Sequence, residues 1–385
     1  MPRLPRLARR LVLLAVALLG LRTIPVTWCA REAEALWADE LALHDALARG
    51  VEQGQLHARA REAFMTGSDR FDGEWMFGTH LMAALGHAQL ARAHPERLAA
   101  ALPIIDAHIE AMLDPEVRAF DREAWGHDPL DELGSPRAHA AYLGYLGLAI
   151  SLRRTLAPGS PHAALGDRIA AHLHAALARS ELGLLQTYPG EVYPVDNAAA
   201  IATLSLHQRA TGADHSEVLA AWDHALPRWL DPSTGLLVQA VSPATAAIVD
   251  GPRGSGTGLA AYFLSFHRAS QSRALYEASR EHLRRDLLGF GAMREYPPGR
   301  DGPGDIDSGP VLLGVSISAT GFALAGSRIH GDAEAFTALW ATTALFGAPV
   351  DRDHTRRFAL GGPLGDAMML ALLTARPSAD WEALP

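Results

Sequence analysis

The chain has 385 residues, of which 49% are hydrophobic, so it can bury a large core as one big domain or two smaller ones. All 34 basic residues are arginines, which excludes Schiff-base chemistry, a catalytic lysine base and the Gly-Lys-Ser/Thr phosphate loop. The single cysteine, Cys29, lies in the N-terminal apolar segment, so the rest of the chain has no disulfide, thiolate nucleophile or cysteine metal site.

The N-terminus has the layout of a secretory signal. Four arginines within residues 1–10 precede an uncharged run, Leu11–Leu21, that is short for a membrane-spanning helix of about 20 residues. Cleavage after Ala30 would place the bulky Trp28 at position −3, which makes a poor site. We therefore expect residues 1–30 to be either a signal peptide or a membrane anchor. The positive-inside rule then places residues 31–385 outside the cytoplasm, in the periplasm or anchored facing it.

The charge of the body limits its partners. Removing residues 1–30 takes away five arginines and no acids, which leaves 29 basic and 43 acidic residues and a net charge of −14. Such a charge argues against nucleic acid or an anionic bilayer as the partner of the body. A small-molecule substrate is the expected partner.

Helical patterning runs through most of the body. Apolar helical segments are expected at residues 75–94, 136–156, 255–270 and 333–347, whereas alternating runs of β-branched residues are almost absent. A Pro/Gly-rich loop precedes every second helix, and we call each of these loops a lip. The lips recur at intervals of 61, 60, 58, 55 and 54 residues; they end at Trp75, Pro136, Asp196, Gly254, Gly309 and Pro363.

This period predicts an all-α fold, a single (α/α)6 toroid of six helix hairpins over residues 31–385. After each lip comes an Ala/Gly/Leu-rich helix, which we expect inside the ring, and then a more charged amphipathic helix outside it. An open helical solenoid is the alternative, but its repeats are usually shorter and share a consensus. The uncharged run Pro310–Gly326 is expected to be an inner helix, with a second membrane span as the rival interpretation.

In a closed ring the lips converge at one end, and they are rich in acids and aromatics. The acids Glu191 or Asp196 and Asp305 or Asp307 are the candidate general acid and base, with His139 and Tyr193 positioning a hydroxyl group. The plainer alternatives are that Asp196 and Asp307 cap helices and that His139 is a core residue, whereas Glu191 lies too far ahead of its helix to cap it. The remaining candidates, for substrate binding, are Asp72, Trp75, Trp125, Tyr142, Asn197, Arg253 and Tyr296.

No metal or cofactor is expected. The segment Asp301–Gly309 has spaced acids but lacks the bidentate Glu that closes a calcium loop, and no glycine-rich phosphate loop is present.

Four motifs carry a family resemblance. In order, "WMFGTHLMAALGHAQL", "RAHAAYLGYLGLAISL", "EVYPVDNAAAIATLSL" and "GDIDSGPVLLGVSISATGFAL" resemble the linalool dehydratase-isomerase family, within the six-hairpin glycosidase-like superfamily, over roughly residues 70–370. The resemblance implies an exported (α/α)6 barrel, often a homo-oligomer. It also implies cofactor-free acid/base removal of water from a tertiary allylic alcohol, with allylic isomerisation. By position it places the family's helix histidine at His139 and its third-lip catalytic region at Glu191 to Asn197. The family's active-site cysteines are absent, and carboxylates stand in that region instead.

Three functions follow as hypotheses. The first is a cofactor-independent C–O lyase or isomerase that uses carboxylates. The second is a glycoside hydrolase or sugar lyase, for which Trp75, Trp125 and Tyr193 would stack on sugar rings. The third is an exported binding protein without catalytic activity.

Overall fold

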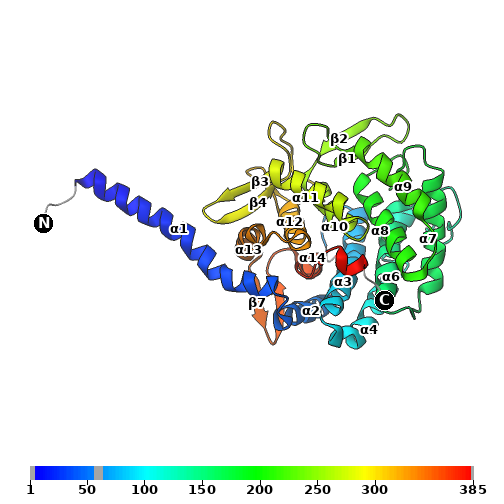
Figure 1. Cartoon of the computed structure of the whole chain (residues 1–385), viewed down its shortest axis with the longest axis horizontal. Helices are drawn as coiled ribbons and strands as arrows, with labels where there is room; N and C mark the ends of the chain where they lie inside the picture. Colours follow the sequence, from blue (N-terminus) through cyan, green and yellow to red (C-terminus); the bar gives the residue numbers. More distant parts are fainter. Residues whose placement is uncertain (1–4, 56–63, 383–385) are drawn as a thin grey trace.

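The computed structural model describes residues 5–55 and 64–382, and within them the chain forms a closed double ring of helices. The inner helices contact one another in sequence and α14 contacts α3, which closes the ring (Figure 1). The inner helices are α3 (Asp69–Ala93), α6 (Tyr145–Leu156), α8 (Pro194–Thr211), α10 (Gly254–Leu264), α12 (Ile317–His330) and α14 (Gly362–Leu373). The outer helices are α2 (Leu41–Gln55), α4 (Leu98–Met112), α7 (Ala163–Ala178), α9 (Ser216–Ala225), α11 (Ala269–Leu283) and α13 (Ala333–Gly347). The prediction of an (α/α)6 toroid is confirmed.

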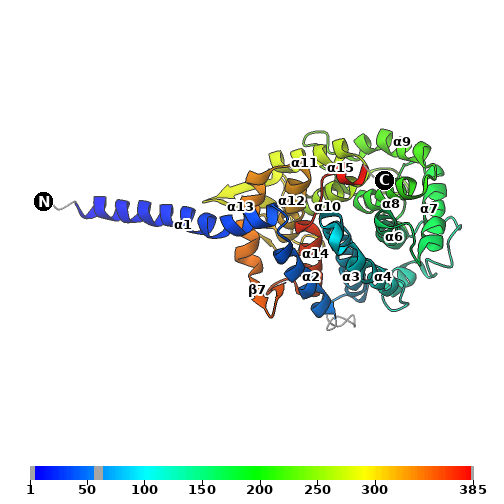
Figure 2. The same cartoon turned by 60° about the horizontal axis from the view of Figure 1, so that its bottom comes forward.

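The sixth helix pair joins the two ends of the body. The last inner helix, α14, packs against the first outer helix, α2, so the ring closes between segments that are far apart in the sequence (Figure 2). Short helices fill the connections: α5 (Ala119–Trp125), α15 (Ala379–Glu382), the 3-10 turns Pro95–Arg97 and Leu226–Trp229, and the π-turn Ala140–Gly144 that precedes α6.

Small antiparallel sheets lie in the lips before α10, α12 and α14. Before α10, β1 (Val238–Val241) pairs with β2 (Ile248–Pro252), and before α14, β7 (Pro349–Arg352) pairs with β8 (Thr355–Phe358). Before α12 lies a four-stranded sheet with the strand order β3-β4-β6-β5. The four-stranded sheet comprises β3 (Arg284–Leu287), β4 (Phe290–Arg294), β5 (Val311–Leu312) and β6 (Val315–Ser316). The expectation of a helix over Pro310–Gly326 is therefore wrong for its first seven residues. Leu313 and Gly314 both adopt positive φ, as in a tight hairpin turn, and α12 begins only at Ile317.

Small residues allow the inner helices to approach closely. A Cβ atom on Gly86 of α3 would lie 2.5 Å from Leu370 Cγ of α14, and one on Gly147 of α6 would lie 2.6 Å from Thr203 Cγ2 of α8. The Thr203 hydroxyl donates to the Gly144 carbonyl at 2.7 Å, which ties these neighbours together. The Ala/Gly-rich composition of the inner helices is thus a packing requirement.

The centre of the ring is closed at the end away from the lips. Gln89, near the end of α3, accepts a hydrogen bond at 3.2 Å from Tyr262, near the end of the opposite helix α10. Both side chains are fully buried, and the Gln89 amide also donates to the Ala371 carbonyl at 2.8 Å. Within the centre of the ring, we therefore look for a site at the lip end.

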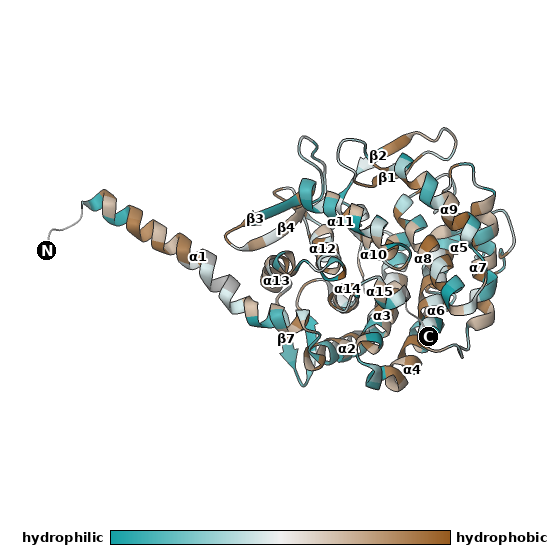
Figure 3. Cartoon of the chain, in the orientation of Figure 1, coloured by the Kyte–Doolittle hydropathy of each residue, from teal (hydrophilic) through white to brown (hydrophobic). Residues whose placement is uncertain are grey.

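The N-terminal helix α1 (Arg6–Trp37) extends away from the ring (Figures 1 and 2). Its C-terminal part belongs to the body: Ala33 and Leu36 are buried, and the ring of Trp37 lies 5.4 Å from that of Phe336 on α13. Its N-terminal part is rich in apolar residues (Figure 3) and leaves large apolar side chains exposed from Leu7 to Leu21. Among the described residues, no helix combines the length and the hydropathy needed to cross a membrane. A signal peptide or anchor at residues 1–30 stays a prediction.

Candidate active site

Three carboxyl groups interact electrostatically at the lip end of the ring. Glu74 lies in the first two turns of α3, Asp196 in the first turn of α8, and Asp307 in the loop before β5. The negative charges of Asp307 and Asp196 both raise the pKa of Glu74, and that of Asp196 raises the pKa of Asp307. Segments more than 200 residues apart thus supply one acid site.

Asp196 is held by two hydroxyl donors. The Tyr145 hydroxyl of α6 donates to Oδ1 at 2.6 Å, and the Thr187 hydroxyl donates to Oδ2 at 2.8 Å. The N-cap of α8 is Tyr193, and Asp196 lies in the first turn of the helix, so it is not the N-cap residue. Burial raises the pKa of Asp196 to about 6, although both hydrogen bonds favour the ionised form. At neutral pH it is an oriented, ionised carboxylate.

Glu74 has the opposite character. The Tyr188 hydroxyl donates to its Oε1, but burial, together with the charges of Asp307 and Asp196, raises the pKa of Glu74 to about 8. A carboxyl group with such a pKa is largely protonated at neutral pH and can give a proton to a leaving oxygen.

Asp307 is the third acid, and solvent reaches it. Burial of the carboxyl group among the surrounding protein atoms and the charge of Asp196 raise its pKa to about 6, while Arg253 opposes the rise. Asp305 positions it: Asp305 Oδ1 accepts the backbone N–H of Asp307 at 3.1 Å and that of Ser308 at 2.9 Å. Asp307 is therefore a second base candidate that faces water.

Asp305, Arg253 and Tyr296 contact one another in this lip, and their predicted roles in acid/base chemistry and substrate binding stay predictions. Arg253 pairs with Asp305 and, at 2.5 Å, with Asp250, and it lies 5.6 Å from the centre of the Tyr296 ring. The Tyr296 hydroxyl donates to the Pro303 carbonyl at 2.9 Å. An acid engaged by an arginine and two backbone amides is poorly suited to accept a substrate proton.

Glu191 and Tyr193 form the rim of the site. The Tyr193 hydroxyl donates to Glu191 at 3.1 Å, and Arg70 lies 3.6 Å from the same carboxylate. Arg70 also covers the ring of Tyr188 at 4.7 Å. Burial and the charges of Glu191, Asp196 and Asp307 raise the pKa of Tyr193 well above its usual range, so its hydroxyl group is a hydrogen-bond donor at neutral pH. Because 39% of the Glu191 side chain is exposed and it is paired with Arg70, it fits substrate contact better than proton donation.

His139 lies behind the site rather than in it. It is fully buried, with Nδ1 2.6 Å from Asp121 Oδ2, and its ring packs 4.5 Å from that of Trp125. Trp125 in turn donates to the Thr187 carbonyl at 3.3 Å, and Thr187 binds Asp196. With no surface open to solvent, His139 supports the wall that orients Asp196, and its predicted positioning of a substrate hydroxyl group stays a prediction.

The other predicted binding residues fall into two groups. Tyr142 and Asn197 are fully buried: Tyr142 donates to the Met112 carbonyl at 3.0 Å, and Asn197 bonds the backbone N–H and carbonyl of Leu185. These two side chains have no surface open to solvent, and their predicted contact with a substrate stays a prediction. Asp72 accepts the Thr66 N–H at 2.7 Å, and Trp75, like Asp72, is partly exposed in the first two turns of α3.

Residue selection from the sequence missed Glu74, Tyr145, Tyr188 and Thr187. Glu74 lies in the first lip with Asp72 and Trp75, so the acid-rich lip was the available signal. Tyr145 follows Tyr142 by three residues, and nothing in the sequence indicates which of the two tyrosines contacts an acid of the site. A pocket of about 240 Å³ lies between α7 and residues 133–135, and its lining includes none of the three acids.

The comparisons with known proteins concern the fold. No protein-family model matches the chain, and no curated protein matches it. The GH76 α-mannanase of Bacteroides thetaiotaomicron is 9% identical, covering 79% of this chain and 86% of that chain, with a TM-score of 0.46. The unsaturated glucuronyl hydrolase of Bacillus sp. GL1 is 14% identical, covering 88% of this chain and 96% of that chain, with a TM-score of 0.47. Likenesses at these values imply no shared site residue or activity, and the resemblance to linalool dehydratase-isomerase stays a prediction.

Proposed function

We propose that this protein is a cofactor-independent acid/base enzyme that cleaves a C–O bond in a neutral, hydroxyl-rich substrate, a glycoside in the first place. The observation that carries the proposal is the contrast between two neighbouring acids: Glu74, with a pKa of about 8, and Asp196, with a pKa of about 6. Glu74 protonates the leaving oxygen. Asp196, aided by Asp307, stabilises the developing positive charge or activates water.

The substrate class follows from the polarity of the site. Carboxyl groups, tyrosine hydroxyls and Arg70 make the site polar and charged. Covering charged groups with an apolar terpene alcohol is costly, whereas the hydroxyl groups of a sugar can hydrogen-bond the oxygens that remain available. Dehydration or isomerisation of a small allylic alcohol is the second candidate, because it begins with the same protonation by Glu74.

The test compares turnover of a panel of aryl glycosides, oligosaccharides and tertiary allylic alcohols by the wild type and by single variants. Glu74→Gln and Asp196→Asn should each lower kcat by about 10²- to 10⁴-fold, the usual contribution of a general acid or base. Asp301→Asn is the matched control, because Asp301 is an exposed acid of the same lip that pairs with Arg294 at 3.3 Å, and it should keep full activity. Full activity in both acid variants would refute the roles given to Glu74 and Asp196. Turnover of the allylic alcohols but not of the sugars would refute a glycoside as the substrate.

For location, we propose that the apolar part of α1 holds the protein at a membrane or is removed on export. In support, Leu11, Leu13 and Leu14 each leave more than half of their surface exposed, which is costly in water. Flotation with lipid vesicles tests this: the full chain should float with them, and a variant lacking residues 1–30 should not.

A further inference from the structure

Two histidines and a carboxylate from three different helices converge on the outer side of the ring. His87 of α3 and His108 of α4 place their Nε2 atoms 3.1 and 3.0 Å from the same oxygen, Oε1 of Glu52 on α2. The three ligand atoms all lie within 4.8 Å of one another. Within residues 5–55 and 64–382, no other group of three His, Cys, Asp or Glu side chains meets this criterion.

The distances suit a divalent cation. In a tetrahedral zinc site with ligands at about 2.0–2.2 Å, neighbouring ligand atoms are about 3.3 Å apart. Two of the three ligand separations are already close to that value, so small side-chain rotations would admit the ion. Two imidazoles and a carboxylate are also among the donor sets that zinc uses with an open fourth position.

The surroundings supply the other features of a metal site. The His108 Nδ1 atom lies 3.1 Å from Nδ1 of His80, which can fix the ring so that Nε2 is directed at the ion. His87 and His108 are only 4% and 5% exposed, whereas 39% of the Glu52 side chain is exposed. A pocket of about 60 Å³ beside Glu52 and His87 leaves room for water as a further ligand.

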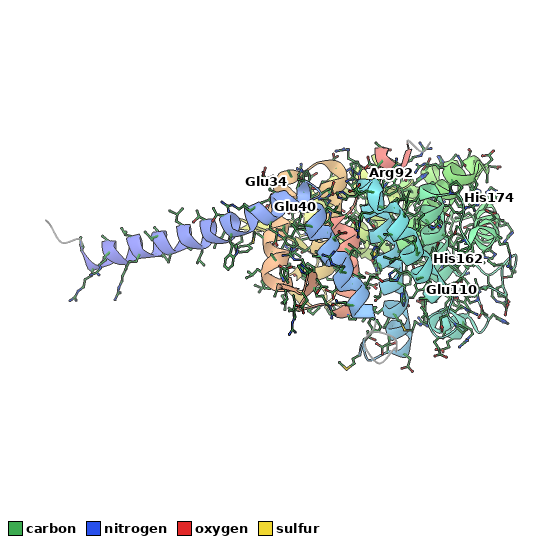
Figure 4. The ribbon with its side chains drawn as sticks, turned by 90° about the horizontal axis from the view of Figure 1, so that it is seen from below. Glu34, Glu40, Arg92, Glu110, His162 and His174 are labelled. Atoms are coloured by element: carbon green, nitrogen blue, oxygen red, sulfur yellow. The ribbon has the colours of Figure 1, made fainter. Side chains whose placement is uncertain are left out.

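We propose that Glu52, His87 and His108 bind one zinc ion or a similar divalent cation, which fastens α2 to the α3–α4 hairpin. Figure 4 views this side of the molecule, with Arg92 labelled near the end of α3 and Glu110 labelled two residues after His108. The site is separate from the acid site: His87 lies 13 residues after Glu74, or about 20 Å along α3 at 1.5 Å per residue. Because α2 is also the partner of α14, the ion would stabilise the closure of the ring.

The test uses the full chain without a histidine tag, stripped with chelator and titrated with Zn²⁺ by calorimetry. We expect one tight equivalent per chain, a higher melting temperature with zinc, and visible d–d bands of a tetrahedral complex when Co²⁺ replaces it. His87→Gln and His108→Gln should abolish all three effects. Glu52→Gln, at a half-exposed position that keeps the variant folded, should weaken binding at least about tenfold.

His207→Gln is the matched control, because His207 is equally buried between helices and also bonds a carboxylate, Asp167, at 2.9 Å. It should keep the tight site. Weak binding of several equivalents, or tight binding that survives both Glu52→Gln and His108→Gln, would show that the three side chains form only a hydrogen-bonded cluster and would overturn the proposal.

Discussion

Replacing Glu74 by glutamine tests whether its carboxyl group is protonated in the folded protein. Its pKa is about 8, against an ordinary value of 4.5, so folding suppresses its ionisation between these two values. Each pH unit between them is worth about 1.4 kcal/mol, so the buried carboxyl group costs the wild type about 3 kcal/mol of stability at pH 7. Above pH 8 this cost reaches about 5 kcal/mol and then levels off.

The sign of the effect follows from the raised pKa. The wild type binds the extra proton when folded, so its stability relative to the glutamine variant is greatest below pH 4.5 and falls as the pH rises to 8. Glu74→Gln should therefore be close to the wild type at pH 5 and clearly more stable at pH 8.5. Urea unfolding followed by tryptophan fluorescence at pH 5, 7 and 8.5 measures this difference.

Asp223→Asn supplies a control of opposite sign. Although burial acts against it, the hydrogen bond from His267 and the charges of His267 and Arg268 lower the pKa of Asp223. Removing this carboxylate should cost more stability at pH 7 than at low pH, where the carboxyl group is protonated in both states. If the stability difference between Glu74→Gln and the wild type stays constant from pH 5 to 8.5, the Glu74 carboxyl group is not protonated in the folded protein at neutral pH, and its role as a general acid is refuted.

Two further predictions concern packing and the acid site. Gly86→Ala should lower the free energy of unfolding by about 1–3 kcal/mol in urea titrations, because its Cβ atom would lie 2.5 Å from Leu370 Cγ. Gly78→Ala on the same helix is the control: its Cβ atom would lie 3.6 Å from Leu364 Cδ1, and the variant should not be destabilised. Tyr145→Phe removes one of the two hydroxyl donors to Asp196 and should raise the pKa of that carboxyl group further above 6, measured by a carboxyl ¹³C titration; an unchanged value would contradict the role of this hydrogen bond.

The ring could be predicted from the sequence because its cause is repeated along the chain. Inner helices touch neighbours on every side and must be small and apolar, and this requirement recurs after each lip. The lip strands were missed because β5 and β6 have two residues each, which is too short for a periodic pattern, and their turn depends on Leu313 and Gly314. The pairing of α14 with α2 has no local signal, since it joins the two ends of the body.

The site was less predictable, because its acids are distinguished by their partners in space. Asp196, Asp305 and Asp307 all stand in acid-rich lips and look alike in the sequence. In the structure Asp196 accepts a hydrogen bond from Tyr145, whereas Asp305 forms an ion pair with Arg253, and only these contacts distinguish an available carboxylate from a paired one. The position of Tyr145 depends on a local irregularity. The π-turn Ala140–Gly144 inserts extra residues per turn, so an α-helical pattern does not predict that Tyr145 is the tyrosine that reaches Asp196.

The charge of the acid site predicts how it should bind a transition-state mimic. Above pH 6 Asp196 and Asp307 are ionised while Glu74 remains protonated up to about pH 8, so the site carries negative charge beside one proton donor. Such a site stabilises a transition state that gains positive charge, as in glycoside cleavage. The affinity for a cationic iminosugar should therefore strengthen as the pH rises from 5 to 7. Asp307→Asn should flatten this dependence, while Asp301→Asn, at an exposed acid of the same lip, should leave it intact. Equal affinity at pH 5 and pH 7 would mean that these two carboxylates do not face the ligand. The acid and base would then have to be other residues of the lips.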